Sequence, residues 1–181
     1  MELCLDEIPS ALGTVLLVTD GAQLCALDYV GYEQRMMDLL KPRFGNFHLK
    51  KSRNPCGFGS SLRAYLHGEL SALDEIPVAT GGTPFQLRVW AALRTIPPGT
   101  VMSYGGIATK LGKPSAFRAV GAANALNPIA IVIPCHRLVG ATGSLTGYAG
   151  GLERKRWLLE YEGVDVERLA KNGNALQRKQ L

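Results

Sequence analysis

Residues 129–137, Ile-Ala-Ile-Val-Ile-Pro-Cys-His-Arg, constrain the fold more than any other stretch of this chain. The apolar run predicts a buried strand, and Pro134 ends it because proline has no N–H to give to a sheet ladder. Cys135 would then lie at the rim of a rigid core, beside an imidazole and a guanidinium. A free thiol has a pKa of about 8.5, so a nucleophilic cysteine depends on such neighbours. The alternative is a small buried hydrophobic residue beside an ordinary turn.

Length and composition indicate a globular protein of one domain or two small ones. The chain has 181 residues, of which 46% are hydrophobic and 19% are charged. Its longest apolar run is too short to cross a bilayer, and its N-terminus lacks the basic start and apolar stretch of a signal peptide. We therefore expect a cytoplasmic protein with no membrane association. In that compartment its four cysteines should be reduced thiols.

Metal-ligand patterns are missing from the sequence. It contains no Cys-x-x-Cys pair and no histidine pair at ligand spacing, so we expect no metal site and no cofactor. The alternative is a zinc site built from Cys4, Cys25 and one histidine. The net charge of +5 mildly favours a polyanionic partner. Much of that charge follows Gly163, and we expect residues 164–181 to form a loosely ordered basic extension. Its basic residues include Arg168, Lys171, Arg178 and Lys179.

The first half predicts an α/β scaffold domain over residues 1–78, with a small antiparallel sheet plus helices. Apolar runs at 14–19 and 23–29 flank Asp20-Gly21, which is a strong hairpin signal. Helices are expected over 33–40, ended by Pro42 and Gly45, and over 61–67, ended by Gly68. Residues 76–82, rich in proline and glycine, are the best linker candidate.

The second half predicts a mainly helical domain over residues 79–163. Thr83, Pro84 and Gln86 match the start of a helix with a capping box. Ser103 should cap a short helix, and a turn at 112–114 leads into another helix over 115–125. Two short helices joined by a glycine turn indicate a helix-turn-helix.

The helix over 115–125 is slim, because most of its residues are small. Phe117 and Val120 can anchor it to the core, and Arg118 is its one long side chain. A major-groove reader normally presents several base-contacting side chains. A slim helix with one guanidinium suits a narrow groove, with the arginine as a wedge. The alternative is a tightly packed helix with a solvated Arg118.

A glycine-rich turn over 146–151 places Tyr148 where it can line a pocket, without the pattern of a phosphate loop. A helix is expected over 152–161, with Glu162 at its end. A carboxylate at a helix C-terminus opposes the helix dipole, so we expect a partner for it, and an imidazole is a good candidate.

Residues 83–163 closely resemble the O6-alkylguanine-DNA alkyltransferase family, with several motifs in the family's order and spacing. The first half resembles the family's N-terminal domain only in general, and the zinc ligands of some members are not reproduced. The motifs are Ser103-Tyr-Gly105, Arg118-Ala-Val-Gly121, Asn127-Pro128, Pro134-Cys-His-Arg137 and Tyr148-Ala-Gly-Gly151.

This resemblance implies that Cys135 is the alkyl acceptor. His136, acting through a water, and Glu162 would generate its thiolate. Asn127 would tie the recognition helix to the turn that carries Cys135. Tyr104 would donate to guanine N3 as negative charge develops on the departing base.

The resemblance also implies how the DNA is held. Arg118 would fill the space left when the damaged nucleotide swings out of the duplex. The implied DNA contacts are Arg118, Ala119, Ser115, Ala123 and Tyr104. The implied base pocket is lined by Tyr148, Ala149, Leu138 and Ala130, whose small residues suit alkyl groups larger than methyl.

The implied activity is single-turnover repair of O6-alkylguanine, and of O4-alkylthymine as a further lesion, by a monomer on double-stranded DNA. Water does not readily cleave the thioether product. Base extrusion is needed because a stacked base hides the O6 alkyl carbon. One alternative is a minor-groove lesion-binding protein of the same fold that transfers nothing. Another is a cysteine hydrolase that uses Cys135, His136 and Asn127.

Overall fold

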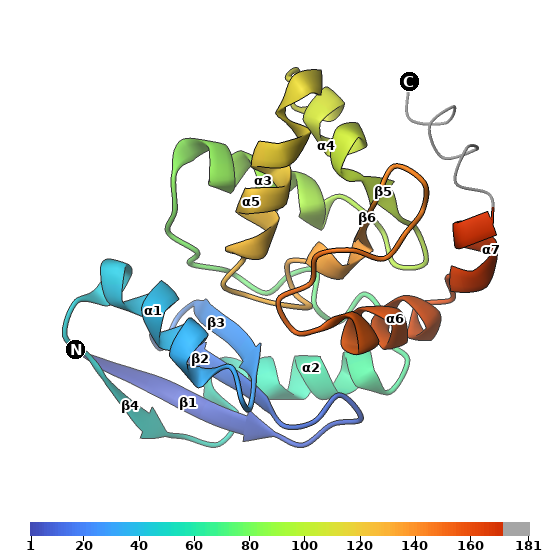
Figure 1. Cartoon of the computed structure of the whole chain (residues 1–181). Coiled ribbons are helices and arrows are strands. Elements are labelled where there is room, and N and C mark those ends of the chain that lie inside the picture. Colours follow the sequence, from blue (N-terminus) through green and yellow to red (C-terminus); the bar gives the residue numbers. More distant parts are fainter. Residues whose placement is uncertain (172–181) are drawn as a thin grey trace. The chain divides into compact units, whose positions relative to one another are not determined.

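The computed structural model describes residues 1–171; residues 172–181, which include Arg178 and Lys179 of the predicted extension, lie outside the described part. The chain forms two compact units (Figure 1). The first consists of Met1–Gly81 together with Pro128–Val132. The second begins with Gly82–Asn127 and resumes at Ile133. The first unit is therefore discontinuous in sequence.

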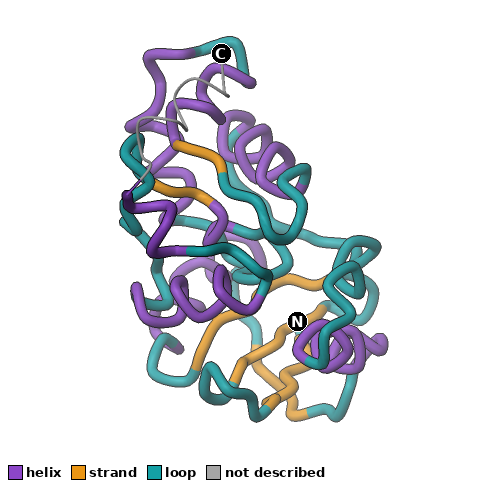
Figure 2. The backbone as a smooth tube through the Cα atoms, turned by 90° about the vertical axis from the view of Figure 1, so that its right-hand side faces the viewer, coloured by secondary structure: helices purple, strands orange, loops and turns teal. Residues whose placement is uncertain are grey.

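A four-stranded sheet in the order β3-β2-β1-β4 forms the centre of the first unit (Figure 2). The predicted hairpin is confirmed, since β2 and β3 pair antiparallel around Asp20-Gly21. The Asp20 carboxylate closes the turn by accepting the N–H groups of Ala22 and Gln23 at 2.9 and 2.8 Å. The strands are β1 Glu2–Ile8, β2 Val15–Thr19, β3 Leu24–Tyr29 and β4 His48–Lys51.

The outer strands join the hairpin in different directions. β1 pairs antiparallel with β2, with Cys4 opposite Thr19, and β4 pairs parallel with β1, with Glu2 opposite His48. Two α-helices accompany the sheet: α1 Glu33–Phe44, and α2 Phe58–Leu66, which follows a 3-10 turn, η1 Pro55–Gly57. Two helices beside a small sheet confirm the predicted α/β class of this half, but the expectation of an antiparallel sheet is wrong, because β4 joins β1 in parallel and makes the sheet mixed.

Helix α1 is longer than the sequence predicts. It runs through Pro42 and ends at Gly45, whose φ of 61° suits glycine, so the expectation that Pro42 ends the helix is wrong. Proline so close to the end costs the helix few hydrogen bonds. Met36 and Leu40 from α1 pack with apolar residues of the sheet. Those sheet residues are Leu3, Leu16, Val18, Cys25 and Ala26.

The second unit is mainly helical, as predicted. Thr83 and Gln86 form the expected capping box, in which the Thr83 hydroxyl accepts the Gln86 N–H at 3.3 Å and the Gln86 amide oxygen accepts the Thr83 N–H at 2.8 Å. The Ser103 hydroxyl accepts the Gly106 N–H at 2.9 Å and so caps α4. The helices are α3 Pro84–Arg94, α4 Tyr104–Lys110, α5 Phe117–Ala125, α6 Leu152–Tyr161 and α7 Val166–Lys171.

Short elements connect these helices. A 3-10 turn, η2 Pro114–Ala116, joins α4 to α5 and completes the predicted helix-turn-helix. A two-stranded parallel sheet pairs β5 Met102–Ser103 with β6 Leu138–Val139. Helix α7 corrects the expectation of a loosely ordered extension for 166–171. It packs on Gly143, where a Cβ would meet the Leu169 carbonyl.

The predicted strand over 129–134 is wrong, although the run is buried. Only Ile129 forms a bridge, to Leu27, which exchanges hydrogen bonds of 3.0 and 2.9 Å with Pro128 and Ala130. The chain then turns, and Ile131 adopts a φ of 67°, a rare value for a β-branched residue. Backbone direction after Ala130 is therefore set by a turn rather than by a sheet ladder.

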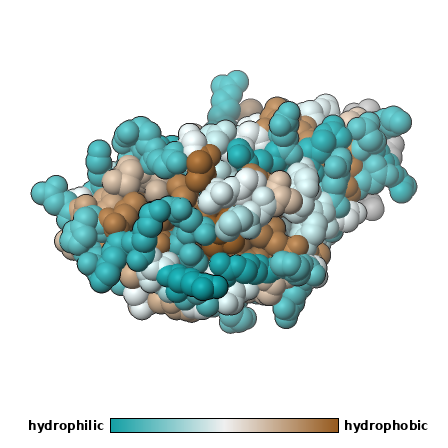
Figure 3. All heavy atoms as spheres, turned by 90° about the horizontal axis from the view of Figure 1, so that it is seen from below, coloured by the Kyte–Doolittle hydropathy of each residue, from teal (hydrophilic) through white to brown (hydrophobic). Residues whose placement is uncertain are grey.

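Polar side chains cover most of the face shown in Figure 3, with smaller apolar patches between them. No helix within residues 1–171 is both long enough and apolar enough to span a bilayer.

Candidate active site

Cys135 begins the 3-10 turn η3 Cys135–Arg137, which leads directly into β6. Its side chain is 4% exposed. The Ile133 carbonyl accepts two hydrogen bonds, from the Cys135 N–H at 2.7 Å and from the Asn127 amide at 2.8 Å. Asn127 follows α5, so the turn that carries Cys135 is tied to the end of that helix. The pairing of β5 with β6 places Tyr104, the residue after β5, in the same part of the fold.

His136, Glu162 and Arg137 form a buried cluster. His136 Nε2 lies 2.9 Å from Glu162 Oε1. Arg137 donates to both carboxylate oxygens, from Nε to Oε2 at 2.9 Å and from Nη2 to Oε1 at 2.8 Å. Its Nη1 donates to the Ile96 carbonyl. The three side chains are 0–7% exposed. The sequence indicated an imidazole partner for Glu162, and the structure shows a guanidinium as well.

The protonation states of this cluster follow from burial and hydrogen bonding. Burial alone raises the pKa of Glu162, but the bonds from His136 and Arg137 outweigh it and hold that pKa well below its usual range. Burial lowers the pKa of His136, although Glu162 opposes the change. At neutral pH a neutral imidazole therefore faces a carboxylate. Because Nε2 donates to that carboxylate, Nδ1 carries the lone pair.

The orientation of His136 leaves Nδ1 able to accept a proton. Nδ1 is buried and has no hydrogen-bond partner among the described residues. A buried nitrogen without a protein partner is uncommon and needs a reason. A role as a general base provides one, because the lone pair on this nitrogen can accept a proton.

Tyr104 opens α4 and packs closely on two glycines. Its hydroxyl donates to the Thr146 carbonyl at 3.0 Å. A Cβ on Gly147 would lie 3.0 Å from that hydroxyl, and one on Gly121 would lie 3.8 Å from the ring. Burial raises the pKa of Tyr104, the Thr146 bond lowers it, and a thiolate at Cys135 raises it.

Lys155 is a site residue that sequence reasoning missed. Its side chain is fully buried in α6, and its Nζ donates to the Thr146 carbonyl at 2.6 Å. Burial lowers the pKa of Lys155 to about 8, while a thiolate at Cys135 acts in the opposite direction. The signal that could have found it is spacing, because Lys155 lies three and four residues before Leu158 and Leu159, on the buried face of α6.

The predicted DNA-contact residues of α5 and of the 3-10 turn η2 before it are not all at the surface. Arg118, Ala119 and Ser115 are exposed. Ala123 is only 3% exposed, and its carbonyl accepts the Trp90 indole N–H at 3.0 Å, so the expectation of a contact there is wrong. Phe117 is 46% exposed, which corrects the expectation that it anchors α5 to the core.

The predicted pocket residues fall into both units. Leu138 and Tyr148 are buried in the second unit at 0% and 8% exposure, and Ala149 there is half-buried. Ala130 belongs to the first unit, where its N–H donates to Leu27. Three of the four residues therefore belong to the second unit and one to the first.

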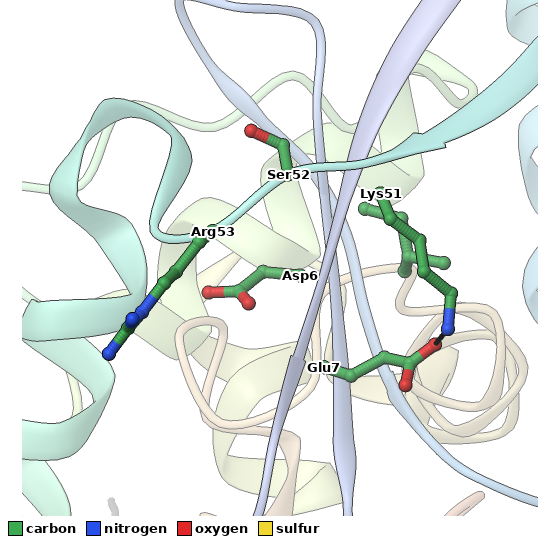
Figure 4. Close-up of a pocket in the computed structure, with 6 residues that line it drawn as sticks. Asp6, Glu7, Lys51, Ser52 and Arg53 are labelled. Atoms are coloured by element: carbon green, nitrogen blue, oxygen red, sulfur yellow. Dashed lines mark ion pairs between the residues drawn. The ribbon is translucent and has the colours of Figure 1, made fainter.

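A separate hollow of about 280 Å³ opens in the first unit beside β1 and the end of β4 (Figure 4). Three of its charged side chains have partners: Lys51 pairs with Glu7 at 2.9 Å, and the Asp6 carboxylate accepts the Asn54 N–H at 3.1 Å. It contains none of the predicted site residues. Across residues 1–171, no group of three or more His, Cys, Asp or Glu side chains is placed to hold a metal ion.

Comparison with known proteins gives consistent results. Residues 84–164 match the family model of the 6-O-methylguanine DNA methyltransferase DNA-binding domain. A methylated-DNA–protein-cysteine methyltransferase of Shigella flexneri is 48% identical over 166 residues, which cover 90% of this chain and 97% of that protein.

Solved structures agree with that match. The crystal structure of Mycobacterium tuberculosis OGT in complex with DNA has a TM-score of 0.72 at 38% identity, covering 92% of this chain and 98% of that chain. The O6-methylguanine-DNA methyltransferase of the archaeon Pyrococcus kodakaraensis also has a TM-score of 0.72, at 28% identity, covering 90% of this chain and 99% of that one.

Proposed function

This chain belongs to the methylated-DNA–protein-cysteine methyltransferase family, and we propose that Cys135 is the cysteine that accepts the alkyl group. The protein repairs DNA directly, by moving an alkyl group from O6 of guanine to a cysteine of its own chain. The observation that carries the assignment is the neighbour of Cys135: a buried imidazole with one nitrogen bonded to a carboxylate and the other unbonded.

That arrangement generates the nucleophile. The Cys135 thiol passes its proton through one water to His136 Nδ1, because adjacent residues seldom point at each other. Glu162 stabilises the resulting imidazolium, and the two bonds from Arg137 fix the orientation of the carboxylate. Burial of the whole cluster strengthens these interactions relative to water.

The chemical step is a displacement at carbon. The Cys135 sulfur forms a bond to the alkyl carbon as the bond from that carbon to guanine O6 breaks, and the electron pair leaves with the base. Tyr104 donates a hydrogen bond or proton to N3 of the departing guanine, which neutralises the charge that builds there. Lys155, buried near Cys135 and Tyr104, adds positive charge to the same region.

DNA approaches through the helix-turn-helix. Reaction at O6 needs the damaged base outside the duplex, because a stacked base cannot be reached by a side chain. Helix α5 is narrow and presents the exposed Arg118, which suits entry into a minor groove and occupation of the vacated stack. Ser115 and Ala119 are exposed on the same stretch and allow close approach of the backbone.

The chemistry of the product and the cysteine content support two further points: each molecule reacts once, and it works in a reducing compartment. The product is a thioether, and Cys135 is the single cysteine of the second unit, since Cys4, Cys25 and Cys56 belong to the first unit. The four cysteines form no disulfide within residues 1–171, which supports a cytoplasmic location.

Intact mass spectrometry tests the assignment. After incubation with duplex DNA that contains O6-methylguanine, the protein should gain one methyl group, located on Cys135 by peptide mapping. Cys135→Ser should gain none while still binding DNA, because a hydroxyl is far harder to ionise than a thiol.

Cys25→Ser is the matched control. Cys25 is also buried, and burial raises the pKa of its thiol to about 11, so its replacement should leave transfer unchanged. Methyl transfer retained by Cys135→Ser would refute the acceptor assignment. Tight lesion binding without any transfer would indicate a lesion-binding protein, and repeated turnover on esters would indicate a hydrolase.

A further inference from the structure

We propose that Phe117 is a second DNA-contacting residue, which enters the minor groove with Arg118 and stacks on the nucleotide next to the extruded one. The inference rests on the proposed function, in which α5 faces duplex DNA. Phe117 would be an aromatic wedge beside the Arg118 wedge. The exposed N-terminal end of α5 would then bind one partner, the minor groove of a damaged duplex.

The first observation is that Phe117 does not serve the core. Its side chain is 46% exposed, whereas α5 buries Val120, Ala123 and Asn124. An exposed phenylalanine carries a large apolar surface and adds little to the stability of the fold. A partner that covers the ring would recover that contribution.

The second observation is the side of α5 on which Phe117 lies. Phe117 and Gly121 are four residues apart and therefore share a face of the helix. The Tyr104 ring lies 3.8–3.9 Å from where a Cβ on Gly121 would be. Phe117 is thus one turn, about 5.4 Å along the axis, from the residue against which Tyr104 packs. Since Tyr104 is the proposed contact to guanine, Phe117 lies on the side of α5 that the nucleotide must approach.

The third observation is the contact between Phe117 and Arg118. The Arg118 guanidinium carbon is 5.6 Å from the centroid of the Phe117 ring, within the range of a cation–π interaction. The ring therefore limits the positions of the guanidinium before DNA binds. Two neighbouring planar groups, one apolar and one charged, match the use of apolar and arginine wedges by minor-groove proteins.

Positive charge around the pair favours DNA as the occupant. Lys110 ends α4 and Lys113 lies in the turn before α5, and both are exposed. Helices α4 and α5 lie side by side (Figure 1), so both lysines belong to the helix-turn-helix; Lys110 Nζ donates to the Thr95 hydroxyl at 2.6 Å, and Lys113 Nζ lies 5.8 Å from the centroid of the Phe85 ring. Lysines at such positions suit phosphates, which orient a protein on the duplex while groove contacts act on the bases.

Phe117→Ala tests the proposal, with Leu87→Ala as the matched control because Leu87 is 45% exposed on α3. Single-turnover transfer is measured on duplex DNA containing O6-methylguanine, with 2-aminopurine next to the lesion to report unstacking, and on free O6-benzylguanine. Phe117→Ala should slow transfer from the duplex roughly tenfold, the size of a lost aromatic–base stack. It should also reduce the 2-aminopurine signal and leave the free-base rate unchanged.

Two further variants separate direct contact from other roles. Phe117→Tyr keeps the ring and should keep the duplex rate. Phe117→Ala combined with Arg118→Ala should be slower on the duplex than Arg118→Ala alone, since a ring that contacts DNA acts without the guanidinium.

Three results would overturn the proposal: a wild-type duplex rate for Phe117→Ala, an equal loss on the free base, or no added loss in the Arg118→Ala background. Failure of the proposed function looks different, because the unsubstituted protein would then transfer nothing from duplex DNA.

Discussion

Replacing Lys155 with methionine is expected to stabilise the protein and to slow alkyl transfer. Lys155 is fully buried, and none of the ion pairs among residues 1–171 includes it. Methionine has a similar length and fills irregular apolar space well. The substitution therefore removes a buried charge without leaving a large cavity.

The size of the gain follows from the pKa of Lys155, which is about 8 in the folded protein against 10.5 for an ordinary lysine. That difference corresponds to about 3 kcal/mol of destabilisation by the charged folded form. The variant also loses the hydrogen bond to Thr146, which reduces this increase in the free energy of unfolding by about 1 kcal/mol. The free energy of unfolding at pH 7 should rise by about 2 kcal/mol, which corresponds to an increase in Tm of about 4–8 °C.

The difference between the two proteins should depend on pH. Below about pH 8, Lys155 is protonated in both the folded and the unfolded protein, so the cost of burying the charge is present in full. Between pH 8 and 10.5 the folded protein loses this proton first, and the wild type becomes more stable as the pH rises. Above pH 10.5 the charge is absent from both states, and the advantage of Lys155→Met should be gone.

Urea denaturation at pH 7, 9 and 10.5 measures the difference in the free energy of unfolding between the wild type and Lys155→Met, with Lys51→Met as the exposed-lysine control. Transfer from free O6-benzylguanine should slow roughly tenfold, the equivalent of about 1.4 kcal/mol of lost transition-state stabilisation. A variant less stable than the wild type at pH 7, or a stability difference that does not change with pH, would refute the reasoning.

Three further substitutions test the site. Glu162→Gln should slow single-turnover transfer by ~10²–10⁴-fold and lower the free energy of unfolding by about 3 kcal/mol, because Arg137 loses its buried partner; an unchanged rate would mean that Glu162 only ends its helix. Tyr104→Phe should slow the chemical step more than it weakens DNA binding, whereas weak binding at a normal rate would place Tyr104 on the DNA backbone. Arg118→Ala should impair repair in duplex DNA far more than reaction with free O6-benzylguanine, and a weakened base pair at the lesion should partly rescue it; equal losses on both substrates would exclude a wedge.

Helices and hairpins whose ends are marked by capping or turn residues could be predicted from the sequence. The capping box at Thr83 and Gln86 fixes the start of α3 through two hydrogen bonds between near neighbours. The hairpin around Asp20-Gly21 and the bounds of α6 follow in the same way, since turn and cap residues act on the backbone beside them. The chemistry of Cys135 and His136 was readable too, because the two residues are adjacent.

Features that depend on distant partners could not be predicted. The apolar run over 129–134 has the composition of a strand, but its only bridge is to Leu27, and the chain turns at Ile131. A short apolar run does not reveal whether a partner strand continues beside it. Strand β4 was missed for the same reason, since its pairing with β1 is set by the sheet and not by its own pattern.

The burial of individual side chains on the helices could not be predicted from the sequence either. Composition suggested that Phe117 anchors α5 to the core and gave no signal for Lys155, whereas the structure exposes Phe117 and buries Lys155. Small helices such as α5 have few apolar residues, so hydrophobicity alone does not fix which face meets the core. A buried cation also goes against the usual distribution of lysine and needs a specific contact to hold it, here the Thr146 carbonyl.

The discontinuity of the first unit has a consequence for how the chain matures during synthesis. Domains tend to fold as the ribosome releases them, N-terminal parts first. Here the piece that completes the first unit, Pro128–Val132, emerges only after the whole of Gly82–Asn127. Until then Leu27 lacks the neighbours that exchange hydrogen bonds with its backbone. Assembly of the N-terminal unit must therefore wait until Gly82–Asn127, the first part of the second unit, has been translated, and Cys135 follows Pro128–Val132 by only three residues.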